Sequence, residues 1–102
     1  MHLIEIFLPL RDNEGARFGH APFAKVRDEL VERFGGLTAF TRSPAEGLWD
    51  EGGGGRSRDE IVIFEVMTES LEPGWWRDYR EMLERRFRQD EVMIRATKVE
   101  RL

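Results

Sequence analysis

Four charged residues of this 102-residue chain could do chemistry together, two glutamates and two arginines. Each lies in a short stretch that is rich in strand-forming residues. In the strand order that is commonest for their topology, the four side chains form a row across one sheet face, in the order Arg95, Glu5, Glu65, Arg42.

Paired carboxylates are suited to proton transfer. When two carboxylates are buried side by side, one of them can titrate near neutral pH and serve as a general acid or base. Glu5 and Glu65 are therefore the candidate catalytic residues. A guanidinium matches a carboxylate through two parallel hydrogen bonds, so Arg42 or Arg95 could hold an anionic substrate.

The same row has a second interpretation. Alternating charges can neutralise one another inside an interface between two copies of the chain, which leaves no free catalytic group. The sequence leaves two functions open. One is a small homodimeric binding or interaction module. The other is a small cofactor-independent enzyme with a carboxylate general base that acts on a small substrate, which could be an anion.

The elements that must position these residues can be read from residue type and spacing. Strand-forming residues indicate strands over residues 3–8, 37–42, 61–67 and 92–99. Two segments between them carry apolar residues at helical spacing, and each opens with a proline. These predicted helices run from Pro22 to a glycine pair at 35–36, and from Pro73 to Phe87.

The order strand–helix–strand, strand–helix–strand predicts an α+β fold of the ferredoxin-like type. Two right-handed units of this kind most often form a four-stranded antiparallel sheet in the order 4-1-3-2, with both helices on one face. At its length the chain, residues 1–102, is expected to be one domain.

Alternation along the strands divides their residues between two faces. The residues predicted to face the helices are Ile4, Ile6, Leu8, Val62, Phe64, Val66, Ile94 and Ala96. The helices are expected to add Phe23, Val26, Leu30, Phe34, Trp76, Tyr79, Leu83 and Phe87 to this core.

The opposite face, here called the open face, carries the charge row and an apolar set. Phe7, Phe40, Ile63, Met67 and Met93 would form an exposed patch larger than monomers usually tolerate, so we expect a homodimer that covers it. In the enzyme interpretation this face binds a small molecule. The candidate ligand-binding residues are Arg42, Arg95, Trp49, Phe7, Phe40, Met67 and Met93.

Residues 43–60 are predicted to form a long arm with a flexible tip at Gly52–Gly55. Trp49 lies in this arm and is expected to anchor it against the body or a second subunit, or else to contact a ligand. The glycine run lacks the spacing of a phosphate-binding loop, and a strand follows it instead of a helix.

Composition excludes several classes of function. The formal net charge is −4, which argues against binding a nucleic-acid backbone. There are no cysteines and only two histidines, so no metal site and no cofactor are expected. No apolar run is long enough to span a bilayer and no signal peptide is apparent, so a cytoplasmic setting without membrane contact is expected.

The middle of the chain resembles a family of small uncharacterised bacterial proteins. The shared pattern is a helix that ends in RFGGLT at residues 33–38, a GLW arm at residues 47–49 and a hydrophobic strand after Arg58. That resemblance implies a fold and brings no activity. The overall plan is also similar to dimeric α+β barrel proteins, which include small cofactor-free monooxygenases and isomerases, and this likeness rests on fold alone.

Overall fold

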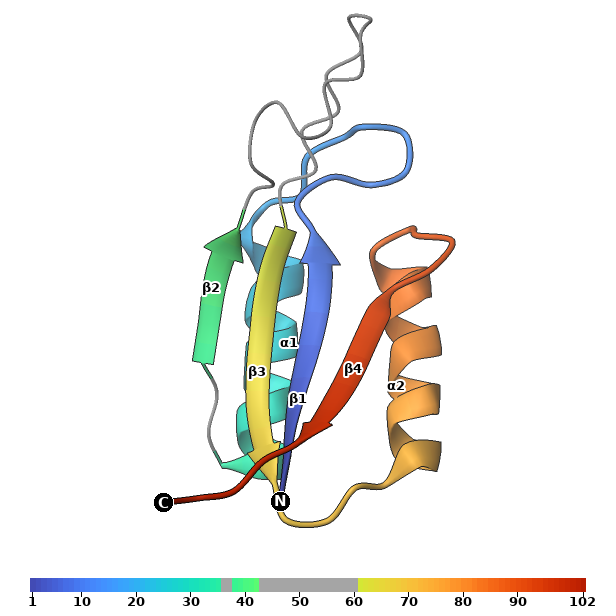
Figure 1. Cartoon of the computed structure of the whole chain (residues 1–102). Coiled ribbons are helices and arrows are strands. Elements are labelled where there is room, and N and C mark those ends of the chain that lie inside the picture. The colour runs from blue at the N-terminus through green and yellow to red at the C-terminus, as the bar shows by residue number, and fades with distance from the viewer. Residues whose placement is uncertain (36–37, 43–60) are drawn as a thin grey trace, which may run out of the picture.

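The computed structural model describes residues 1–35, 38–42 and 61–102 (Figure 1). The arm predicted over residues 43–60, with Trp49 and Gly52–Gly55, lies outside the described residues. The predicted α+β class is confirmed. The elements are β1 (His2–Pro9), α1 (His20–Phe34), β2 (Thr38–Arg42), β3 (Ile61–Thr68), α2 (Pro73–Arg86) and β4 (Met93–Lys98).

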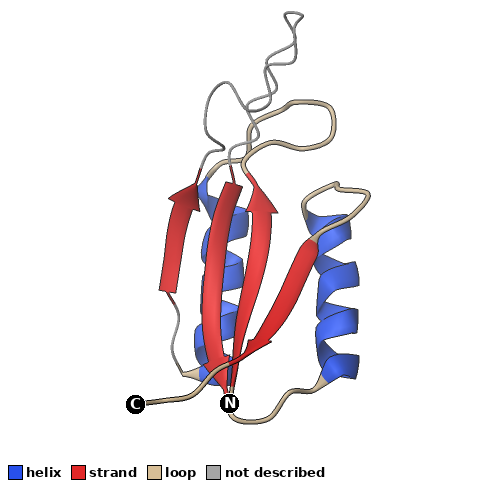
Figure 2. Cartoon of the chain, in the orientation of Figure 1, coloured by secondary structure: helices blue, strands red, loops and turns tan. Residues whose placement is uncertain are grey.

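The strands hydrogen-bond in the order β2-β3-β1-β4, so β1 and β3 are the inner strands and β2 and β4 the edges (Figure 1). Each neighbouring pair is antiparallel. Both helices lie on the same side of the sheet, and no helix crosses the side turned toward the viewer in Figure 2. Neither α1 nor α2 is long and apolar enough to cross a membrane.

The core lies between the sheet and the two helices. Alternation along β1 places Ile4, Ile6 and Leu8 in it, each with at most 1% of its surface exposed. Burial of such side chains contributes about 1.5–3 kcal/mol each before the loss of conformational entropy is subtracted. Most of the residues predicted to face inward belong to this cluster or pack against it.

Strand β4 departs from the predicted pattern. Ala96 was expected in the core and is exposed, while Ile94 is only half-buried. The edge strand has a neighbour on one side only, and α2 lies lateral to it in Figure 1, so the helix layer covers β4 incompletely. Val92, just before β4, is instead buried in the core, and its N–H donates to Glu84 Oε2 at 3.0 Å.

The open face is also less uniform than predicted. Ile63 is fully buried, although it lies outside the core cluster, so the prediction that it is exposed is wrong. It lies on an inner strand and is paired on both sides, with Phe7 of β1 and Phe40 of β2. Met67 lies beyond the end of the pairing with β2, and Met93 lies on the edge strand, so their side chains are 48% and 53% exposed.

One charged network joins the two helices. Arg86 of α2 donates hydrogen bonds from Nη1 and Nη2 to Glu29 Oε1 and Oε2 of α1, both at 2.8 Å. The Tyr79 hydroxyl donates to Glu29 Oε1 at 2.9 Å. The bonds from Arg86 hold the pKa of Glu29 below its ordinary value against the opposing effect of burial, and the bond from Tyr79 lowers it further. The network therefore stabilises the helix pair while Glu29 is ionised.

We expect Glu29→Gln to lower the free energy of unfolding at neutral pH by about 1–3 kcal/mol, because a hydrogen-bonded charge is lost. A lowered pKa means that this stabilisation is present above the unfolded-state pKa and is lost as pH falls through the folded-state pKa. In urea titrations, the difference in free energy of unfolding between wild type and Glu29→Gln should therefore become smaller below pH 4.5, the ordinary pKa of a glutamate. Glu32→Gln, at an exposed position of the same helix, is the control. An equal loss of free energy of unfolding in both variants would contradict a stabilising role for the Glu29 network.

Candidate functional site

The two candidate catalytic glutamates face each other across the inner strands. The register pairs Glu5 of β1 with Glu65 of β3 on one side and with Arg95 of β4 on the other. Residues directly opposite in an antiparallel pair have their Cβ atoms about 4.5–5.5 Å apart. The central part of the predicted row, Arg95, Glu5 and Glu65, is therefore present.

Arg95 neutralises one carboxylate of the pair. Its Nε donates to Glu5 Oε1 at 2.8 Å, and its guanidinium lies over the Phe7 ring, 4.9 Å from the ring centroid. The Glu5 side chain is only 14% exposed, whereas that of Arg95 is 56% exposed. Arg95 thus covers Glu5 from the solvent side.

Glu65 has a different environment. Burial raises the pKa of the Glu65 carboxyl, and the charge of Glu5 and a hydrogen bond with Glu5 raise it further. Among the described residues, no arginine or lysine lies within ion-pair distance of Glu65. The pair therefore consists of one carboxyl group held by a guanidinium and one whose pKa is raised.

The predicted place of Arg42 beside Glu65 is wrong. The register pairs Thr38 with Glu65 and places Arg42 opposite Ile61, at the other end of β2. The sequence prediction assumed a strand pairing that was shifted along the chain, and the short β2 offers few residues by which the register could have been recognised. The described row thus ends at Glu65.

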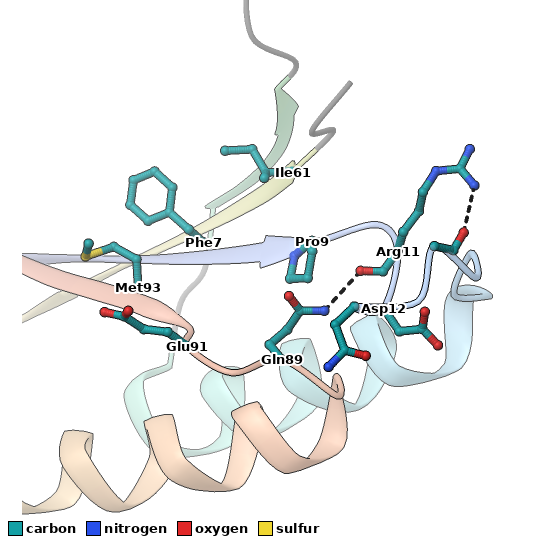
Figure 3. Close-up of a pocket in the computed structure, with 10 residues that line it drawn as sticks. Phe7, Pro9, Arg11, Asp12, Ile61, Gln89, Glu91 and Met93 are labelled. Carbon is teal, nitrogen blue, oxygen red and sulfur yellow. Dashed lines mark hydrogen bonds between the residues drawn. The ribbon is translucent and has the colours of Figure 1, made fainter. Parts of the chain in front are cut away.

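A cavity of about 620 Å³ is lined by residues of β1, β3 and β4 and of the loops that follow β1 and α2 (Figure 3). Its volume lies in the range typical of small-molecule sites. Phe7 and Met93 form part of its floor, two positions along their strands from Glu5 and Arg95, which corresponds to about 7 Å. Its lining residues are Phe7, Pro9, Arg11, Asp12, Asn13, Gly15, Ile61, Gln89, Glu91 and Met93.

Two loops build the polar wall of this cavity. Asp12 is buried, and its Oδ1 accepts hydrogen bonds from the backbone N–H groups of Glu14 and Ala16 at 2.9 and 2.8 Å, which fixes the loop after β1. Gln89 Nε2, from the loop after α2, donates to the Arg11 carbonyl at 3.1 Å (Figure 3). The two loops are therefore held against each other.

Sequence reasoning missed these wall residues. The segment Asp12-Asn13-Glu14-Gly15 has the composition of a turn, which could have indicated a fixed loop. Nothing in the sequence indicates that Gln89 reaches this loop, because the contact joins residues that lie far apart in the chain.

Of the remaining candidate ligand-binding residues, some line the cavity, some lie away from it and some lie outside the described part of the chain. Met93 lines the cavity, whereas Met67 lies opposite Leu3 at the far end of β1 and is not part of its lining. Phe40 occupies the register position opposite Ile63, and its side chain lies outside the described part. Trp49 lies outside the described residues altogether.

The described side chains favour acid–base chemistry. Within residues 1–35, 38–42 and 61–102, no group of three or more His, Cys, Asp or Glu side chains could hold a metal ion. The pair offers Glu65, whose pKa is raised, Glu5, which Arg95 holds in place, and an adjoining cavity. This arrangement can donate a proton to a small molecule or accept one from it.

Comparison with known proteins adds a likeness of fold. No protein-family model matches the chain, and no curated protein matches it. A solved structure of a phage SAM lyase in complex with S-methyl-5'-thioadenosine is similar, with a TM-score of 0.60 and 16% sequence identity. The match covers 95% of this chain and 80% of that chain.

We expect Glu65→Gln to leave the free energy of unfolding unchanged at neutral pH or to raise it by up to about 1 kcal/mol, because like charges opposite each other are destabilising. A raised pKa means that the stabilising effect of the protonated carboxyl is present at low pH and is lost as pH rises through the folded-state pKa. Wild type should therefore gain stability relative to Glu65→Gln on acidification.

Urea titrations of both proteins between neutral and acidic pH test this expectation. Glu69→Gln changes an exposed glutamate just after β3 and serves as the control. A clear loss of stability in Glu65→Gln at neutral pH would instead mean that the Glu65 carboxylate neutralises a cation in the folded protein.

Proposed function

We propose that the chain is a small cofactor-independent enzyme of ferredoxin-like fold that transfers a proton to or from a small molecule. This proposal rests on the different surroundings of the two carboxyl groups, Glu5 and Glu65. Arg95 pairs with Glu5 alone, and the pKa of Glu65 is raised by burial and by Glu5. A pair that served only to neutralise charge would have a cation for each carboxylate.

Each member of the pair then has a role. Glu5, held by Arg95, supplies the negative charge that helps to raise the pKa of Glu65. Glu65 donates its proton to the substrate as a general acid, and in its ionised form it accepts a proton as a general base. The apolar part of the substrate lies on Phe7 and Met93, next to the pair.

The fold neighbour supplies the first molecules to test. Its identity to this chain is 16%, so the likeness concerns fold, and its ligand is a probe for this chain and not an assignment. SAM and S-methyl-5'-thioadenosine are small enough for a cavity of about 620 Å³. Both contain an apolar group that could lie on an aromatic floor.

We expect the purified protein to consume SAM or a related small molecule, and Glu65→Gln to slow turnover by about 10²–10⁴-fold, the usual contribution of general acid–base catalysis. Chromatographic analysis of substrate and product measures this. Glu69→Gln should retain the wild-type rate. Equal rates in wild type and Glu65→Gln would contradict a catalytic role for the pair.

The exposed methionines favour a second candidate function, an interaction module that forms a homodimer through the open face. Met67 and Met93 are about half exposed on the same face as the carboxyl pair. A second copy laid on this face would cover both side chains and would also close the cavity, so a dimer is compatible with the enzyme as well.

We expect light scattering of the purified protein at micromolar concentration to give twice the chain mass of 12.0 kDa. Met67→Glu places a charge on the open face outside the cavity and should shift the protein to the monomer. Leu71→Glu, at an exposed apolar residue of the loop before α2, should leave the dimer intact. A wild-type protein that is monomeric under these conditions excludes the interaction module.

A further inference from the structure

The outer edge of β4 is available for strand pairing. β4 is the last strand of the sheet, and no described segment pairs with its far side. All of its residues except Ile94 are exposed. It contains no proline, which would interrupt the row of backbone donors and acceptors along this edge. An extended peptide could therefore continue the sheet here.

α2 lies beside this edge with no strand in front of it (Figures 1 and 2). Between the helix and β4 is a cavity of about 220 Å³, lined by Pro73, Trp76, Arg77, Arg80 and Ile94. A strand added next to β4 would lie over this flank of α2. Side chains from that strand would reach the cavity.

The cavity carries positive charge that the described residues neutralise only in part, since Arg80 forms an ion pair with Glu84. Arg77 has no carboxylate within ion-pair distance among the described residues. Arg80 Nε is buried without a hydrogen-bond partner, and its nearest carboxylate oxygen, Glu84 Oε2, is 3.8 Å away. That same oxygen already accepts the Val92 N–H at 3.0 Å. Two guanidinium groups therefore face the cavity in a chain whose net charge is −4.

We propose that the edge of β4 binds an acidic, extended segment of a partner protein. The backbone of the segment pairs with β4, and one of its carboxylate side chains lies between Arg77 and Arg80, where it gives Arg80 Nε an acceptor. A second copy of β4 fits poorly, since the strand MIRATK has no carboxylate side chain to place between Arg77 and Arg80. Charge complementarity thus selects an acidic partner.

The probe is a fluorescein-labelled peptide of about eight alternating glutamate and valine residues, long enough to span a strand of ordinary length. Fluorescence anisotropy should show saturable binding to the wild-type chain. The double variant Arg77→Ala with Arg80→Ala should bind about tenfold or more weakly, because the charge-assisted hydrogen bonds to the peptide carboxylate are lost.

Lys25→Ala with Arg27→Ala removes the same number of positive charges from exposed positions on α1 and is the matched control. It should bind the peptide like wild type, and a lysine–valine peptide should not bind. Backbone amide shifts on titration should be largest at residues 93–98. A version of the peptide with alternate amides N-methylated should bind weakly, because it cannot pair with β4.

Three results would each overturn the proposal. One is absence of binding below about 1 mM peptide. Another is an equal loss of peptide affinity in the two double variants, which would mean that overall charge alone attracts the peptide. The third is self-association that depends on Arg77 and Arg80 while the peptide does not bind, which would identify a second copy as the occupant.

Discussion

The pairing of β1 with both β3 and β4 determines where every other feature of the sheet lies. One face of β1 supplies Ile4, Ile6 and Leu8 to the core, and the other presents Glu5 and Phe7. Because successive side chains point to opposite faces, a shift of one residue in this register would bury Glu5 and expose the core residues. The cost of burying a charge therefore enforces the same register that brings the two glutamates together.

The carboxyl pair is built with unequal surroundings. A cation on the edge strand covers Glu5, while Glu65 faces Glu5 from an inner strand. Two like charges separated by one strand spacing are tolerated because Arg95 neutralises one of them and a proton can neutralise the other. The same geometry places Phe7 under the Arg95 guanidinium, so one arginine contacts both the carboxyl pair and the start of the cavity floor.

Much of the fold could be predicted because it depends on local patterns. Alternation identified the inward residues of β1, and helical spacing identified buried residues such as Val26, Leu30 and Leu83. The opposition of Glu5 and Glu65 followed from strand order and from the strand positions of the two residues. These features need only the period of each element and the usual connection between elements.

Other features depend on information that is not local. The place of Arg42 depends on how a short edge strand is aligned with its neighbour, and an error of a few residues there moves a side chain out of the row. The cavity wall depends on Gln89 reaching the Arg11 carbonyl across 78 positions of sequence. The burial of Ile63 and the exposure of Ala96 depend on which strands are inner and which are edges. Alternation along a strand does not predict this difference.

The sparse burial of β4 has a consequence for how the molecule opens. An edge strand with one half-buried residue has a low free energy of local opening, whereas β1 is buried at every second position. We therefore expect the backbone amides of residues 93–98 to exchange with solvent hydrogen sooner than those of β1. Each such opening withdraws Arg95 from Glu5. The Glu5 side chain then meets water without its guanidinium partner. The strand that shields the carboxyl pair is thus also the one whose fraying opens the pair to solvent.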